Sequence, residues 1–195
     1  MLRATGLAAA IGVGALGHAA LAEPSIGERI ASAALGQVGV TVVYDPAYTR
    51  LSYPGGDVPP ERGVCSDVVI RALRAQRVDL QQLLHEDMRA HFSAYPQKWG
   101  LRAPDRNIDH RRVPNLQTYF RRRGLALPIT RDAGDYETGD VVAYTLPGGL
   151  SQFGVVAASR SGDGARPLLI HNIGAGAQLE DVLFAYEIVG HYRWR

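Results

Sequence analysis

The stretch GVCSDVVIRAL, residues 63–73, marks the point at which a long loop turns into a predicted helix. Its apolar residues recur three and four positions apart, as on the buried face of a helix: Val68, Val69, Ala72 and Leu73. Cys65, the only cysteine of the chain, falls in the first turn of this helix. Helix N-termini stabilise thiolates, which makes Cys65 a candidate nucleophile. Free cysteines are also among the most buried residue types, so an inert core residue is the alternative.

Three other segments carry helix signals. Ser25 and Glu28 form a capping box ahead of apolar residues at helical spacing. Asp79 opens a second segment with a similar Asp-x-x-Gln pattern, and Pro114 suits the first turn of a third. The predicted helices are residues 25–36, 79–95 and 114–123.

Beyond residue 140 the apolar residues change to the alternating pattern of strands. Turn sequences at 147–149 and 161–164 join the first three predicted strands as antiparallel neighbours. The strands are expected over residues 140–146, 152–159, 167–172 and 185–194, with a further extended piece at 40–44 ahead of the irregular loop 45–63. Helices followed by a strand meander predict an α+β domain, with N-terminal helices packed on a small antiparallel sheet.

The N-terminus has the composition of a secretory signal peptide. A basic start is followed by an uncharged stretch, residues 4–17, and Ala20-Leu21-Ala22 matches the pattern that signal peptidase cuts. We predict cleavage after Ala22, a single domain over residues 23–195, and a periplasmic or secreted location. An uncleaved N-terminal anchor is the alternative. No later segment is long and apolar enough to span a bilayer.

The overall composition is that of a globular domain, with 46% hydrophobic and 21% charged residues. A formal net charge of +2 is too small to indicate a nucleic-acid partner. One cysteine excludes an internal disulfide framework. The histidines and the cysteine lack the spacing of a metal site, and Gly174-Ala-Gly176 lacks the third glycine of a dinucleotide loop. The sequence predicts neither a metal nor a cofactor.

A cysteine nucleophile needs a base within hydrogen-bond reach, and His171 is the best candidate by position. It lies on a predicted strand, where it shares one face with Leu169, and could meet the helix N-terminus at the strand end. A structural histidine is the alternative. Asp67 is expected to cap its helix, whereas Asp109 and His110 stand in a polar loop that could line a substrate cleft.

Four segments resemble the YijF-like domain of unknown function: YDPAYTRLSYPGGDVPPERGVCSDVVIRALRAQ (44–76), NIDHRRVPNLQTYF (107–120), GDVV (139–142) and IHNIGAGAQLEDVLF (170–184). The resemblance runs from about Ile30 to Arg193. That family in turn resembles, distantly, the papain-like NlpC/p60 cell-wall peptidases. The resemblance implies a papain-like fold with Cys65 as nucleophile, His171 at the third, orienting position, and Tyr44 as an upstream tyrosine that contacts the nucleophile.

The chain departs from the family pattern at the catalytic histidine, where a His-Ile-Gly-Ile-Val sequence is expected and Gln152-Phe-Gly-Val-Val is present. Glutamine cannot act as a general base near neutral pH. Either the site is inactive, or His171 has become the base with Gln152 or Asn172 orienting it. Gln152 could also donate to an oxyanion.

Two functions follow from this departure. The first is an exported thiol hydrolase that cleaves an amide bond, with peptidoglycan stem peptides as the substrate implied by the resemblance. The second is a binding module of the same fold that holds a cell-wall fragment or a protein partner. A purely structural domain with Cys65 in its core is a third and weaker interpretation.

Overall fold

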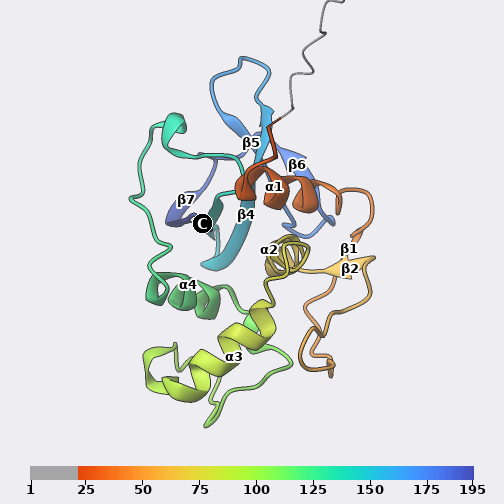
Figure 1. Cartoon of the computed structure of the whole chain (residues 1–195), viewed down its shortest axis with the longest axis vertical. Helices are drawn as coiled ribbons and strands as arrows, with labels where there is room; N and C mark the ends of the chain where they lie inside the picture. Colours follow the sequence, from red (N-terminus) through yellow and green to blue (C-terminus); the bar gives the residue numbers. More distant parts are fainter. Residues whose placement is uncertain (1–21) are drawn as a thin grey trace, which may run out of the picture.

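Residues 22–195 are described by the computed structural model, and within them four α-helices are followed by a five-stranded sheet (Figure 1). The predicted signal peptide lies outside the described residues, apart from Ala22. The helices are α1 (Ile26–Leu35), α2 (Cys65–Arg74), α3 (Leu80–Ala90) and α4 (Val113–Arg122). Short 3-10 helices lie between them and after them: η1 (Phe92–Ala94), η2 (Asp109–Arg111) and η3 (Ala133–Asp135).

The sheet has the strand order β6-β5-β4-β3-β7, and all neighbouring strands are antiparallel. Its strands are β3 (Val141–Leu146), β4 (Leu150–Arg160), β5 (Pro167–His171), β6 (Gln178–Glu180) and β7 (Glu187–Tyr192). Two short strands, β1 (Val43–Tyr44) and β2 (Arg62–Gly63), form a separate parallel pair ahead of α2. The predicted α+β class, with helices packed on a small antiparallel sheet, is confirmed.

Two elements differ from the prediction. The helix expected to reach Tyr95 ends at Ala90, because His91 leaves helical geometry with φ −139°. The chain then folds back, and the Tyr95 hydroxyl donates a hydrogen bond of 2.7 Å to Asp87 on α3. Strand β6 was not predicted because three partly exposed residues are too few to show an alternating pattern.

The two faces of the sheet carry separate apolar clusters. On one face α2 packs against α1 and β4, and buries Val69 and Leu73 with Phe153 and Ile170 (Figure 1). The other face carries Val142, Tyr144, Val156, Leu169 and Leu183. Each large apolar side chain buried in this way contributes about 1.5–3 kcal/mol. Residues of α2 therefore cannot shift without disturbing the sheet on which they pack.

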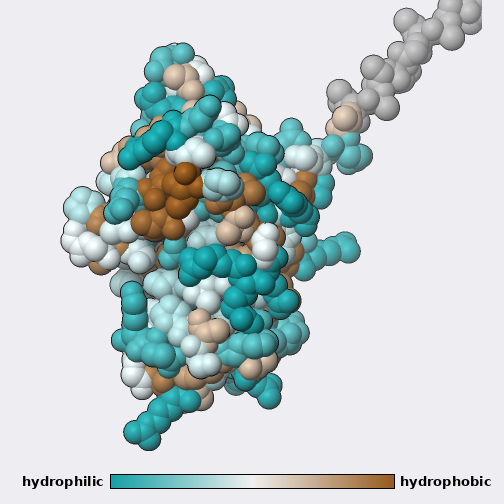
Figure 2. All heavy atoms as spheres, turned by 90° about the vertical axis from the view of Figure 1, so that its left-hand side faces the viewer, coloured by the Kyte–Doolittle hydropathy of each residue, from teal (hydrophilic) through white to brown (hydrophobic). Residues whose placement is uncertain are grey.

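Figure 2 shows the face that lies on the left in Figure 1, where apolar side chains gather in a patch surrounded by hydrophilic ones. Ile129 and Val189 are among the exposed large apolar residues of the described chain. Within residues 22–195, no helix has the length and apolar character needed to cross a membrane.

Candidate functional site

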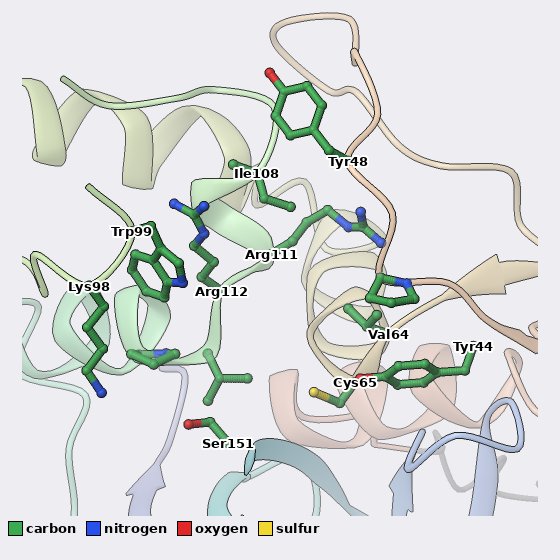
Figure 3. Close-up of a pocket in the computed structure, with 13 residues that line it drawn as sticks. Tyr44, Tyr48, Val64, Cys65, Lys98, Trp99, Ile108, Arg111, Arg112 and Ser151 are labelled. Atoms are coloured by element: carbon green, nitrogen blue, oxygen red, sulfur yellow. The ribbon is translucent and has the colours of Figure 1, made fainter. Parts of the chain in front are cut away.

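A cleft of about 550 Å³ opens at the N-terminus of α2, where the loop after β1 and the segment from η2 into α4 approach each other (Figure 3). Its lining includes three basic side chains, three aromatic ones, the thiol and a hydroxyl: Lys98, Arg111, Arg112, Tyr44, Tyr48, Trp99, Cys65 and Ser151. No carboxylate and no imidazole belongs to this lining. The cleft therefore brings the thiol together with positive charge and aromatic surface.

The start of α2 is fixed by a buried charge pair. Asp67, at the third position of the helix, accepts a hydrogen bond of 2.7 Å from the Val64 backbone N–H. Its carboxylate also receives two bonds, of 3.0 and 2.9 Å, from the Arg111 guanidinium, and both side chains are 3% exposed. Asp67 caps its helix, as predicted, and does not line the cleft.

The Cys65 thiol is 4% exposed. Burial raises its pKa to about 12, and the negative charge of Asp67 adds to the rise. Hydrogen bonds from backbone groups, that of Phe153 first, oppose this shift but do not overcome it. The expectation that the helix N-terminus lowers the pKa of this thiol is thus wrong, because desolvation outweighs the helix dipole. At neutral pH the sulfur carries its proton.

His171 ends β5 and is 2% exposed. Strand alternation places it on the side of Leu169, whereas Ile170 on the other side packs in the cluster that contains Cys65. Its Nε2 lies 2.9 Å from Glu180 Oε2, without the geometry of a hydrogen bond. Burial lowers the pKa of His171, and Glu180 opposes the shift. Among the described residues no hydrogen bond joins this imidazole to the thiol.

Gln152 and Asn172 connect the sheet to the loop in front of the thiol. The Gln152 side chain donates to the Asn172 carbonyl at 2.9 Å, and the Asn172 side chain donates to the Gly63 carbonyl at 3.1 Å. Both residues are buried, and neither lines the cleft. Neither side chain bonds the imidazole of His171, whose two nitrogens have no hydrogen-bond partner in residues 22–195. The expected orienting contact to His171 is therefore not made.

Asp109 and His110 lie behind the cleft wall and do not line it. Asp109 is 1% exposed and accepts hydrogen bonds from the Asp105 backbone at 2.6 Å and from Arg112 at 2.8 Å. Its pKa is raised, chiefly by burial. Burial lowers the pKa of His110 to about 4. These two buried residues adjoin Arg111 and Arg112, which line the cleft, but are not themselves part of the lining.

Tyr44 does line the cleft, and in Figure 3 its hydroxyl points toward Cys65. Its pKa is raised, first by burial and then by the proximity of Cys65. The structure thus brings Tyr44 and the thiol together, as the resemblance implied for an upstream tyrosine.

Sequence reasoning missed most of the cleft wall. Trp99 and Arg112 belong to the polar loop from which only Asp109 and His110 were predicted to line a cleft, and Lys98 directly precedes this loop. The Arg112 guanidinium carbon lies 4.1 Å from the Trp99 ring centroid. Ser151 comes from β4, where the sequence drew attention to its neighbour Gln152. A tryptophan inside a basic loop was the available signal, since such a side chain is seldom left without a packing partner.

The chain resembles known proteins more closely in sequence than in structure. "Uncharacterized protein YijF" of Escherichia coli (strain K12) is 61% identical over 165 residues, which cover 85% of this chain and 80% of that protein. The structure of NlpC1 from Trichomonas vaginalis matches 86% of this chain with a TM-score of 0.45 and 15% identity. The match takes up 44% of NlpC1, so this chain spans less than half the length of that protein. The family described as "Domain of unknown function (DUF1287)" matches residues 31–194. The chain belongs to this DUF1287 family, as the four sequence motifs predicted.

Proposed function

We propose that this chain is a peptide-binding domain whose cleft holds its ligand above Cys65 without cleaving it. The proposal is carried by the cleft lining, which among residues 22–195 includes no imidazole and no carboxylate, and by the burial of Cys65, which raises the pKa of its thiol. A protonated thiol is a poor nucleophile, and catalysis would need a base in hydrogen-bond reach. Gln152, which stands where the family pattern has histidine, is buried outside the cleft lining and supplies no base there.

The proposed ligands are peptides outside the cytoplasm, with cell-wall peptides first. Two features of the sequence support this choice: the predicted signal peptide, residues 1–22, and the distant resemblance to cell-wall peptidases. The cleft volume of about 550 Å³ suits a few residues of an extended peptide and falls within the range of small-molecule sites.

A thiol-dependent amide hydrolase with His171 as base is the second candidate. One observation favours it: both ring nitrogens of His171 are buried without a hydrogen bond among the described residues, and only the Glu180 carboxylate, 2.9 Å from Nε2, lies within ion-pair distance. Such groups are costly to leave unsatisfied and often belong to a site that rearranges with its ligand.

The rate of Cys65 alkylation against pH, followed by intact mass, separates the two candidates. Because burial raises the pKa of this thiol, its thiolate fraction at pH 7 is well below that of a free thiol. We expect slow labelling at neutral pH, unchanged in His171→Ala. A half-point well below the free-thiol value that is lost in His171→Ala would refute the binding-only proposal and support the hydrolase.

A second set of variants asks whether a base is all that is missing from the cleft. The side chain at position 152 is buried outside the cleft lining, so we expect Gln152→His to leave alkylation as slow as in the wild type, whereas Ser151→His, at a position that lines the cleft, should accelerate it at neutral pH. The matched control is Gln82→His, which changes a glutamine of α3 outside the cleft lining and should leave the rate as in the wild type. Folding of each variant is checked by its thermal transition.

A further inference from the structure

The charges of the cleft are unevenly compensated. Arg111 is neutralised by Asp67, at 2.9 Å, and Arg112 by Asp109, at 2.8 Å. Both carboxylates are almost fully buried behind the wall. Lys98, the third cation of the lining, has no ion pair and no hydrogen bond to any residue in the range 22–195. The cleft therefore presents one uncompensated positive charge.

The surroundings of Lys98 suit a carboxylate. In Figure 3 the Lys98 side chain runs beside Trp99 toward the level of Ser151, whose hydroxyl points to the same part of the cleft. The Ser151 hydroxyl has no hydrogen-bond partner in the described part of the chain, so it is free to donate. Trp99 is 37% exposed and is held by the guanidinium of Arg112 stacked on it. An ammonium, a hydroxyl and a fixed aromatic wall thus meet at this end.

We propose that the Lys98 end of the cleft binds a carboxylate of the ligand, so that the preferred ligand is an acidic peptide. The ammonium of Lys98 pairs with the carboxylate, the Ser151 hydroxyl donates to it, and Trp99 packs against the neighbouring methylene groups. One free cation matches one singly charged carboxylate better than a phosphate dianion, whose second charge would find only guanidinium groups already paired. This inference rests on the proposed function and names its ligand class.

The test compares two peptides that differ in one group, acetyl-Ala-Glu-amide and acetyl-Ala-Gln-amide. Each is titrated to millimolar concentration into the mature protein, and binding is followed by the indole N–H signal of Trp99 in NMR spectra. We expect the acidic peptide to bind about fivefold more tightly, the ratio that a partly exposed ion pair gives. The preference should shrink with added salt, because screening weakens such a pair.

Three variants locate the preference. Lys98→Gln should remove the preference, so that the two peptides bind with equal affinity, and Lys98→Arg should retain the preference. Arg131→Gln is the matched control, since it removes one positive charge outside the cleft lining and should keep the wild-type ratio.

The outcomes separate this inference from the proposed function. Equal affinity for both peptides in the wild type, or a preference that survives Lys98→Gln, overturns the carboxylate site while leaving peptide binding intact. No binding of either peptide at millimolar concentration overturns the proposed function and this inference with it.

Discussion

Single residues in this chain owe their chemistry to burial more than to their place in an element. Cys65 stands at a helix N-terminus, where a sequence pattern indicates an activated thiol, yet desolvation raises its pKa to about 12. His110 shows the same effect with the opposite sign, because burial favours its uncharged form and lowers its pKa. Desolvation depends on residues far away in the sequence, so no local motif reports it.

The buried His110 makes the stability of the domain fall in mild acid. Burial lowers its pKa to about 4 in the folded protein, against an ordinary value of about 6.5 for an unfolded chain. Between these values the unfolded chain binds the proton and the folded chain does not, so stability rises with pH across this window. The free energy of unfolding should fall by up to about 3 kcal/mol at the low-pH end of this window. Urea unfolding from pH 7 to pH 4 should show this loss in the wild type and less of it in His110→Gln.

His91→Gln is the comparison for that experiment, at a histidine whose side chain is 52% exposed and lies 3.5 Å from Asp87. The loss of stability in acid should persist in this variant, since the buried His110 is unchanged. If the free energy of unfolding of His110→Gln and of the wild type changed with pH in the same way, burial would not lower the pKa of His110 in the folded protein.

At the scale of elements, α2 is held in place by charges as well as by apolar packing. Asp67 bonds the backbone in front of the helix, and Arg111 bonds Asp67 and the carbonyls of Asp45 and Ala47. One buried pair therefore joins the start of α2, the η2 segment and the loop that forms one wall of the cleft.

Breaking this pair should cost far more than breaking a surface pair. Asp67→Asn leaves the buried guanidinium of Arg111 without its countercharge, and we expect a loss of about 3–5 kcal/mol in the free energy of unfolding. Asp163→Asn removes a charge from an exposed pair with Arg166 and should cost far less, because solvent screens that pair. Chemical denaturation of both variants measures the two costs. Similar losses in both would mean that the Asp67–Arg111 pair is not desolvated.

The elements themselves were largely predictable from sequence, and the cleft was not. The capping box of Ser25 and Glu28 forms as predicted, because both partners lie within one turn. Strands β3, β4 and β5 follow from alternating residues and glycine turns. Trp99 and Arg112 meet across a loop, and loops have no residue periodicity from which a contact could be predicted. The position of Ser151 beside the thiol depends on the register of the strands. Such contacts arise from tertiary packing.

At the scale of the whole molecule, α1, the first helix of the described residues, begins close to the predicted cleavage site. The Ser25 backbone and side chain complete the cap of α1, at 2.7 and 3.1 Å from Glu28. Gly27 lies so close to the Thr138 carbonyl that a Cβ there would approach within 2.2 Å. The start of α1 is thereby docked on the segment that leads into β3. Glu23 and Pro24 are exposed.

This placement predicts that removal of residues 1–22 leaves the fold intact. The mature chain, residues 23–195, should unfold at the same temperature as the full chain, whereas a chain that begins at Ile26 loses the Ser25 cap and should lose about 1 kcal/mol. Mass spectrometry of protein recovered from the periplasm should give Glu23 as the first residue. Recovery of the full-length chain in the membrane fraction would instead identify the N-terminal segment as an uncleaved anchor, and the cleft would then act at a membrane surface.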